Sequence, residues 1–385
     1  MEEKNINKKA YTFSDVLIIP KYSEIESRKN VDISAKMGDL ILDLPVVSAN
    51  MKTVTGPAMA IAMSENGGMG VLHRFCSIDQ AVQDFMTVKE HFENRVTTSS
   101  SGTNGGLYIF VNGDEKAKKI VSTTSNDNDN RYVVSKPWSV GVSVGVQDED
   151  KERFVKLYEA GARIFFIDIA HGFCKLLKDI TKWIREQNLK DLYVVGGNAA
   201  TADGAYSLVE WGVDAIKCGI GPGSACLTRK NAGVGVPQLY ALETIKNDFV
   251  HQGLKNPIIA DGGMSSTGDI AKALKFADAV MLGGMLAGTT ETPGSVFTND
   301  KGEFYKTYMG SASGENKVGN SSANEFIEGI AKTIIFRGHV KHVLRHIRQG
   351  LQSAFSYVGA NNLQEFQEKC EFIEITSGGK IESKI

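Results

Sequence analysis

The sequence predicts a single α/β domain, a (β/α)8 barrel of the TIM type that spans residues 1–385, and two observations carry this prediction. Eight short apolar runs occur along the chain, and they do not alternate apolar with polar side chains. Runs of this kind are typical of parallel strands buried on both faces. Helical patterns lie between the runs, and repeated strand-then-helix units imply a parallel sheet, which eight strands can close into a barrel.

The predicted elements follow one another at short intervals. Strands are expected at residues 44–49, 67–72, 138–145, 163–167, 192–195, 215–218, 257–260 and 279–282. Helices are expected at residues 151–160, 178–187, 202–211, 267–276 and 339–356. Glycine and polar residues follow most of the strands directly, which is where barrels of this class carry their active-site loops.

Two segments break the strand-helix pattern. Residues 93–135 are rich in Ser, Thr, Asn and Asp, which predicts a flexible insertion. Residues 309–329 are rich in Gly, Ser and Asn and poor in large apolar side chains. A mobile flap over the active site is one interpretation of this second segment, and a disordered surface loop is the alternative.

Composition and charge limit the class of protein. The formal net charge of −2 provides no basic surface for nucleic acid. No stretch is apolar enough to cross a membrane, and the N-terminus lacks the apolar region of a signal peptide, so we expect a soluble cytoplasmic protein. Five cysteines occur without CxxC spacing, which indicates neither a zinc site nor a redox dithiol.

The most informative segment is the loop GIGPGSACLTR at residues 219–229. Its closely spaced glycines bring backbone amides and carbonyls near a ligand, either a phosphate or a cation. Cys226 lies in this loop beside Arg229 and Lys230, and cationic neighbours favour the thiolate, which is the nucleophilic form of cysteine. A buried structural cysteine is the alternative. Thr228, two residues on, could relay a proton or position a small molecule.

Two glycine pairs follow the last two predicted strands. They belong to the segments ADGG at 260–263 and MLGG at 281–284. The loops after the seventh and eighth strands of such barrels commonly bind phosphate, and Asp261 could hold ribose hydroxyls. Asp168 ends the fourth strand and could contact a cofactor. Because no GxGxxG segment joins a strand to a helix, a dinucleotide would have to bind in the barrel mouth.

Taken together, these motifs resemble the IMP dehydrogenase/GMP reductase family. The resemblance runs from Thr12 to the C-terminus and omits only the 93–135 insertion. It rests on SANMKTV, IDIAHG, GGNAAT, GIGPGSACLTR, GVGVPQ, IADGG and MLGGMLAG, which occur in this order. The insertion is too short for the pair of CBS domains that some members carry there, so none is expected.

The resemblance implies one of two activities, both through a covalent cysteine adduct. GMP reductases convert GMP to IMP and ammonia with NADPH in nucleotide salvage, whereas IMP dehydrogenases oxidise IMP to XMP with NAD. The segments Ser27-Arg28, Ile169-Ala170, 310–313 and 353–360 look like the reductases, and the resemblance places Thr333 where dehydrogenases carry a water-activating arginine. Residues 67–73 and 376–383 look like the dehydrogenases. We therefore expect a GMP reductase, with IMP dehydrogenase as the alternative.

The resemblance also implies roles for individual residues. Catalytic residues would be Cys226, Thr228 and Glu328. Nucleotide-binding residues would be Ser224, Asp261, Gly262, Gly263, Gly283, Gly284, Gly310, Ser311 and Gly329. Cofactor-binding residues would be Ser27, Arg28, Arg74, Asp168, Ile169, Ala170, Gly221, Ser353 and Ser356. A monovalent cation, K+, would be held at Gly221, Gly223, Cys226 and Arg229.

The assembly and the ligands follow from the same resemblance. It implies GMP or IMP as the small-molecule substrate, NADPH as the cofactor, and a homotetramer in which Ser27-Arg28 serves a neighbouring subunit's site. A non-catalytic nucleotide-binding relative is a further alternative. Its mark would be the loss of Cys226, Thr228 or Glu328, and all three are present.

Overall fold

The eight predicted strands form a closed parallel barrel. The computed structural model describes residues 9–94, 139–310 and 329–383. Around the barrel the strands run in chain order, and the last pairs with the first. They are β4 (Val46–Ser48), β5 (Met69–Leu72), β6 (Val140–Val144), β7 (Ile164–Asp168), β8 (Tyr193–Ala199), β9 (Ala215–Cys218), β10 (Ile258–Asp261) and β11 (Ala279–Leu282).

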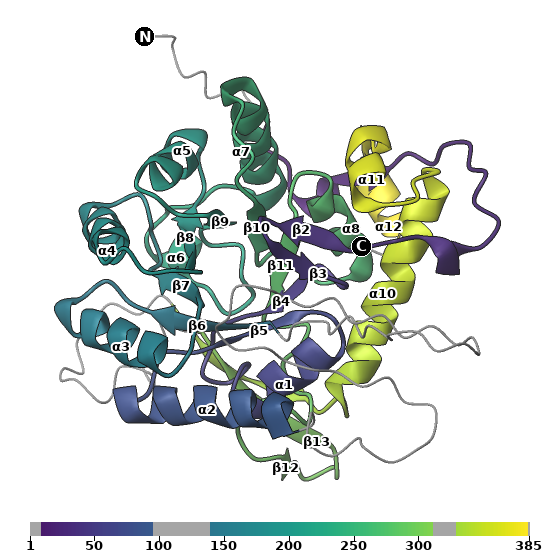
Figure 1. Cartoon of the computed structure of the whole chain (residues 1–385). Coiled ribbons are helices and arrows are strands. Elements are labelled where there is room, and N and C mark those ends of the chain that lie inside the picture. Colours follow the sequence, from purple (N-terminus) through teal and green to yellow (C-terminus); the bar gives the residue numbers. More distant parts are fainter. Residues whose placement is uncertain (1–8, 95–138, 311–328, 384–385) are drawn as a thin grey trace, which may run out of the picture.

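A ring of helices surrounds these strands (Figure 1). Its members are α1 (Pro57–Glu65), α2 (Ile78–Asn94), α3 (Asp148–Glu159), α4 (Lys175–Glu186), α5 (Ala202–Glu210), α7 (Gln238–Gln252), α8 (Thr267–Leu274) and α10 (Val340–Tyr357). Each turns an apolar stripe inward; in α4, Leu177, Ile180 and Ile184 are buried at helical spacing. The ring closes because α10 packs against both α8 and α1.

The core has two layers, one between strands and helices and one inside the barrel. The inner layer includes Val71, Phe166 and Met281, all fully buried. A hairpin of β2 (Ala35–Met37) and β3 (Leu40–Leu42) adds Met37 and Leu42 to this layer, next to residues that begin the barrel strands. The hairpin therefore seals one end of the barrel and leaves the carboxyl ends of the strands for the site.

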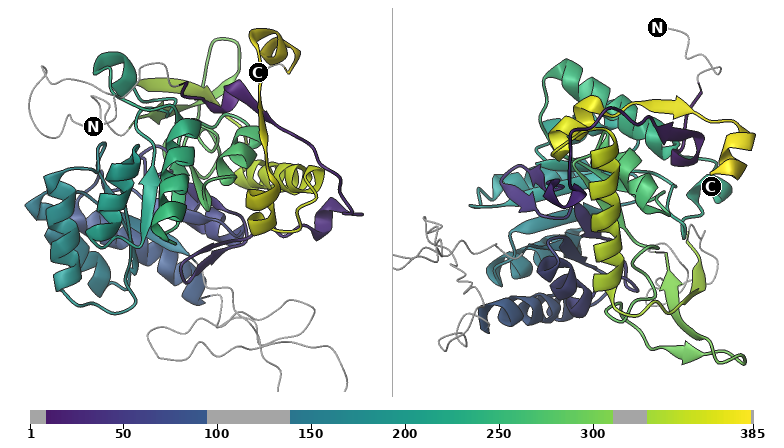
Figure 2. Two further views of the ribbon diagram at one scale, coloured as in Figure 1. Left: turned by 90° about the horizontal axis from the view of Figure 1, so that it is seen from above. Right: turned by 90° about the vertical axis from the view of Figure 1, so that its right-hand side faces the viewer.

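The two ends of the described chain lie together. β1 (Val16–Ile18) pairs antiparallel with β15 (Phe372–Glu374), so the N-terminal segment in purple runs beside the C-terminal segment in yellow (Figure 2). Short elements complete the fold: the 3-10 helices η1 (Phe13–Asp15) and η2 (Arg28–Asn30), and the helices α6 (Thr228–Asn231), α11 (Leu363–Lys369) and α12 (Ser377–Glu382). Within the described ranges, no helix has the length and apolar character needed to cross a membrane.

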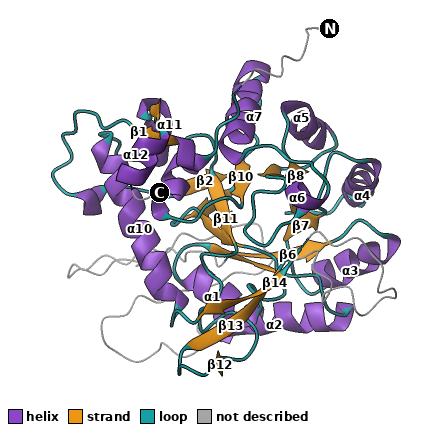
Figure 3. Ribbon diagram, turned by 180° about the vertical axis from the view of Figure 1, so that it is seen from behind, coloured by secondary structure: helices purple, strands orange, loops and turns teal. Residues whose placement is uncertain are grey.

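A small antiparallel sheet that the sequence analysis did not predict follows the barrel. It consists of β12 (Phe297–Thr298), β13 (Phe304–Met309) and β14 (Ala331–Ile335) (Figure 3). The expected flap overlaps its edges, but most of that segment, like most of the 93–135 insertion, lies outside the described residues. Thr333 is exposed on β14, opposite Thr307, and does not line the cavity described below. The correspondence of Thr333 with the water-activating arginine therefore stays a prediction.

Candidate active site

A cavity of about 890 Å³ opens at the carboxyl ends of the barrel strands. This volume is within the range of small-molecule sites, which are commonly a few hundred to about a thousand Å³. Twelve of the predicted site residues line it: Arg74, Asp168, Ile169, Ala170, Gly221, Gly223, Cys226, Thr228, Asp261, Gly262, Gly310 and Gly329. The structure thus brings residues from distant loops into one space, as the barrel topology requires.

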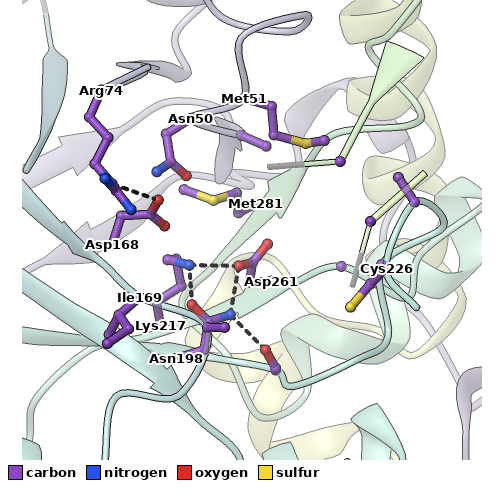
Figure 4. Close-up of a pocket in the computed structure, with 18 of the residues that line it drawn as sticks. Asn50, Met51, Arg74, Asp168, Ile169, Asn198, Lys217, Cys226, Asp261 and Met281 are labelled. Atoms are coloured by element: carbon purple, nitrogen blue, oxygen red, sulfur yellow. Dashed lines mark hydrogen bonds and ion pairs between the residues drawn. The ribbon is translucent and has the colours of Figure 1, made fainter. Parts of the chain in front are cut away.

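Cys226 lies at one side of this cavity (Figure 4). Its backbone N–H donates to the carbonyl of Gly223 at 3.0 Å, which makes a tight turn just before the thiol. Its Sγ is 3.1 Å from Oγ1 of Thr228. A hydroxyl at that distance can exchange a hydrogen bond with a thiol or thiolate, so the two side chains form a pair that can share a proton.

The chain after β13 packs against the cysteine loop. The backbone of Gly329 forms an isolated antiparallel bridge with Cys226, and the N–H of Ile330 donates to the carbonyl of Ala225 at 3.1 Å. The N–H of Gly310 donates to Ile330 in turn, at 3.0 Å. The chain before residue 311 and the chain after residue 328 therefore meet beside the cysteine loop.

Glycine is required where the loop leaves β9. A Cβ on Gly219 would lie 2.3 Å from the carbonyl oxygen of Asp261, and Gly221 has a φ of +83°. The loop wraps around Arg229, whose guanidinium donates to the carbonyls of Val236 and, at 3.4 Å, Ile220. Burial lowers the pKa of Arg229, while the nearby Cys226 raises it by favouring the guanidinium cation. A fixed positive group therefore lies on the far side of the thiol's loop.

The other cysteines do not share this environment. All five are free thiols. Burial raises the pKa of Cys218 strongly and that of Cys370 to about 12, and it also raises the pKa of Cys76. Cys174 begins α4 and does not line the cavity. Of the five, Cys226 combines access to the cavity with a hydroxyl partner.

A group of hydroxyls gathers at the glycine pair after β11. A Cβ on Gly283 would lie 2.9 Å from the hydroxyl of Tyr308, and a Cβ on Gly284 would lie 2.9 Å from Oγ of Ser224. These distances show how closely the two hydroxyls approach the backbone. Burial raises the pKa of Tyr308, so its hydroxyl stays a donor at neutral pH. Hydroxyls and glycine amides together suit an anion.

An ion pair lies on the opposite side of the cavity from Cys226 (Figure 4). Nε of Arg74 is 3.5 Å from Oδ2 of Asp168, and both side chains are partly exposed to the cavity. Near them, Nδ2 of Asn50 is buried and has no hydrogen-bond partner among the described residues. An unpaired buried donor beside an ion pair fits a polar ligand group such as a carboxamide.

The sequence analysis missed a buried lysine between these two sides. Lys217 is 3% exposed, and its Nζ donates to Oδ2 of Asp261 at 2.8 Å and to Oδ1 of Asn198. Asn198 also donates to Oδ2 of Asp261, at 2.8 Å, so one carboxylate oxygen is held twice while Figure 4 shows the other turned away from these partners. Burial alone lowers the pKa of Lys217, but Asp261 and Asp168 raise it above its ordinary value.

Some predicted residues lie elsewhere. Arg28 donates to Oγ of Ser353 at 3.2 Å, and Ser356 donates to the carbonyl of Ser353, so Ser27, Arg28, Ser353 and Ser356 form a separate group on η2 and α10. These four residues do not line the cavity. Gly263 packs against Pro222 and Gln238 just behind it. Ser311 and Glu328 lie outside the described residues.

The predicted K+ site would use backbone carbonyl oxygens as ligands. Within the described residues, no cluster of three or more His, Cys, Asp or Glu side chains could hold a metal ion. The expected K+ ligands, Gly221, Gly223, Cys226 and Arg229, lie in one loop around the thiol. The carbonyl of Gly223 already accepts the N–H of Cys226. Binding of K+ at this loop therefore stays a prediction.

His73, next to Arg74, gives the protein a pH-dependent stability. The pKa of His73 is lowered to about 4, mainly by burial and to a smaller extent by the positive charges of Lys52 and Arg153, against the opposing effect of Asp84. Nδ1 of the neutral ring accepts the N–H of Phe75 at 3.2 Å. The unfolded chain takes up a proton below about pH 6.5, and the folded chain does so only near pH 4.

We therefore expect the free energy of unfolding to fall by up to about 3 kcal/mol as the pH falls through this interval. His73→Asn places an acceptor at the position of Nδ1 without a titrating group, so it should remove this part of the pH dependence. Urea unfolding of both proteins at pH 7 and pH 5 measures the difference. Equal losses of stability in the two proteins would contradict the assignment.

Comparison with known proteins adds independent information. The family model described as "IMP dehydrogenase / GMP reductase domain" matches residues 10–385. The inosine-5'-monophosphate dehydrogenase of Cryptosporidium parvum is 35% identical, over 100% of this chain and 96% of its own. That of Nitrosopumilus maritimus is 32% identical, over 98% of each chain. The GMP reductase of Leishmania donovani is 29% identical, over 97% of this chain and 96% of its own.

The lengths of these alignments differ. The alignment with the Nitrosopumilus maritimus protein extends over 471 positions, more than the 385 residues of this chain, whereas that with the Cryptosporidium parvum protein extends over 404. The first relative therefore carries internal residues that this chain lacks. Relatives with both names match over nearly their whole length, so similarity alone does not select one activity.

Proposed function

Since the chain belongs to the IMP dehydrogenase/GMP reductase family, whose members are nicotinamide-dependent oxidoreductases, we propose that it is a GMP reductase. The proposal is that it converts GMP to IMP and ammonia with NADPH. The observation that carries the chemistry is Cys226, whose Sγ lies 3.1 Å from the Thr228 hydroxyl in a cavity that Gly221, Gly223 and Gly262 also line. The choice of the reductase over the dehydrogenase rests on the reductase-like segments Ser27-Arg28 and Ile169-Ala170.

The reaction would proceed through a bond between Cys226 and the base. The thiolate adds to C2 of the purine, the exocyclic amine takes up a proton and leaves as ammonia, and C2 stays bonded to sulfur. Bound NADPH would supply a hydride to C2. The C–S bond then breaks, and its electron pair returns to sulfur as the thiolate. Two easier displacements thus replace one difficult substitution on an aromatic ring.

Thr228 would handle the proton in these steps. Its hydroxyl is close enough to Sγ to take the thiol proton or to pass one to the departing amine. A hydroxyl with a pKa far from neutral is a weak base by itself, so we assign it a relay role with Glu328 as the expected partner. The backbone of Gly329, which follows Glu328 in the sequence, pairs with Cys226.

The nucleotide and the cofactor would divide the cavity between them. Asp261, held by Lys217 and Asn198, would accept the ribose hydroxyls. The Arg74–Asp168 pair and the unpaired Nδ2 of Asn50 fit the amide end of a nicotinamide on the other side. Contacts remote from C2 fix the distance between sulfur and base, which is how binding contributes to rate.

Assembly and cation binding extend the proposal. Ser27, Arg28, Ser353 and Ser356 lie outside the cavity of their own chain. We propose that they serve the cofactor of a neighbouring subunit in a homotetramer. A potassium ion held by carbonyls of the 221–229 loop would then support the conformation of the thiol's loop.

Paired assays test the proposed reaction. We expect GMP to cause loss of the NADPH absorbance band, with one ammonia and one IMP formed for each NADPH consumed. IMP with NAD should give no XMP. The relatives named inosine-5'-monophosphate dehydrogenase keep the second activity as the alternative. Formation of NADH and XMP from IMP and NAD, with no reaction of GMP and NADPH, would establish it instead.

A further inference from the structure

The register of the small sheet places a lysine beside a tyrosine that lines the cavity. Lys332 of β14 lies directly opposite Tyr308 of β13, so the two side chains project from the same face of the sheet. Tyr308 is 3% exposed and lines the cavity. The flanking residues Ala331 and Thr333 are exposed on the other face. Strand alternation therefore directs Lys332 toward the barrel mouth.

The contacts of Lys332 locate its charge. Its Nζ lies 5.5 Å from the ring centroid of Tyr308 and donates to the backbone carbonyl of Ser224 at 3.1 Å. The hydroxyls of Tyr308 and Ser224 are the two that approach Gly283 and Gly284. Lys332 thus contacts the two residues whose hydroxyls approach the glycine pair, and no ion pair of Lys332 is found within the described residues.

A second cation, Arg337, lies near the turn at Gly283 and Gly284 but makes different contacts. Arg337 donates to the carbonyl of Met285 at 3.1 Å and to that of Gly284 at 3.4 Å. It therefore lies on the carbonyl side of the turn, whereas an anion would bind on the side of the amides and hydroxyls. Lys332 contacts Ser224 and Tyr308, whose hydroxyls would face such an anion.

We propose that Lys332 binds the 5′-phosphate of the purine nucleotide, together with Ser224, Tyr308 and the glycine pair after β11. The inference rests on the proposed function for the identity of the nucleotide. An ammonium on a flexible stem can leave the Ser224 carbonyl and reach a phosphate oxygen, and a charged pair of this kind is stronger than a neutral hydrogen bond.

This contact would also link the phosphate to the reacting end of the site. Lys332 is three residues from Gly329, whose backbone pairs with Cys226. A phosphate that holds Lys332 therefore holds the start of β14 against the cysteine loop. Binding energy from a group remote from C2 would in this way help to fix the position of the thiol.

The test compares Lys332→Gln with Lys332→Arg and Lys301→Gln. Lys301 lies at the exposed β12–β13 turn of the same sheet, so its substitution removes the same charge away from the cavity. We expect Lys332→Gln to raise the Kd of IMP and the KM of GMP by about tenfold, with kcat within about threefold of the wild type. Lys332→Arg should stay close to the wild type, and Lys301→Gln should have no effect.

Titration with salt gives a second readout. The dependence of IMP affinity on salt should be weaker in Lys332→Gln, because one charge contact is lost. An unchanged Kd, or an equal loss in Lys301→Gln, overturns the inference. Binding of IMP needs no turnover, so a wild-type protein that binds IMP but does not reduce GMP contradicts the proposed reaction alone. A wild-type protein that binds neither nucleotide contradicts both.

Discussion

Replacing Cys226 by alanine should lower the turnover of GMP by at least about a thousandfold, which corresponds to ~4 kcal/mol of the activation barrier. Without the thiol, no covalent bond to C2 can form, and Thr228 lacks the group with which it shares a proton. The residues proposed to hold the nucleotide are others that line the cavity, among them Asp261 and Gly262. The affinity for IMP should therefore change by less than about fivefold. Consumption of NADPH and titration with IMP measure the two effects.

Cys174→Ala is the matched control. Cys174 is a half-buried thiol at the start of α4 and lies outside the cavity. Its substitution should leave turnover within about twofold of the wild type, since changes away from a site usually have small effects. If Cys226→Ala kept more than about a tenth of the wild-type rate, a covalent route through this sulfur would be untenable.

The fold was predictable because a strand that is buried on both faces appears in the sequence as a short continuous apolar run. All eight predicted runs became barrel strands, and the bounds moved in all of them except β9 and β11. The largest shift is in β8, predicted to end at Val195 but extending to Ala199. In the sequence, Gly196 and Gly197 indicate the end of a strand, yet residues of β7 and β9 pair with both of them. Tertiary pairing thus overrode the local preference of glycine to end a strand.

The parts of the structure that were missed depend on contacts between distant segments. The β2–β3 hairpin and the β12–β14 sheet are short, and their role becomes visible only once the barrel that they cover exists. Cys226 could be singled out from its loop alone, because glycines and basic residues surround it in the sequence. Tyr308 could not, since its approach to Gly283 joins two segments that are far apart in the sequence.

Lys217 is the clearest case of a site residue hidden from sequence analysis. The run AIKC contains one lysine, a residue that is rarely buried without a partner. Its partners, Asp261 and Asn198, come from the two neighbouring strands, β10 and β8, and meet it only in the closed barrel. The signal that could have found it is the charge itself, in a run that is otherwise apolar.

Lys217→Met should destabilise the protein by about 3–5 kcal/mol, the usual range when one partner of a buried ion pair is removed. Methionine keeps most of the volume of the lysine stem, so little packing is lost. The fall in the free energy of unfolding would therefore come mainly from the carboxylate of Asp261, which would lose its cation. The same change should raise the KM of GMP, because Asp261 would no longer be held for the ribose. Urea unfolding and steady-state kinetics measure the two effects.

The pH dependence and a double-mutant cycle separate charge from packing. Because Asp261 and Asp168 raise the pKa of Lys217 above 10.5, its contribution to stability is complete below pH 10.5 and is lost only as the pH rises through the higher folded value. Between pH 6 and 9 the effect of Lys217→Met on the free energy of unfolding should therefore be constant.

Asp261→Asn in the Lys217→Met background should recover at least about 1 kcal/mol of the free energy of unfolding, since it removes the charge left without a partner. If the two substitutions were additive, Lys217 would act through packing and not as the cation that fixes Asp261.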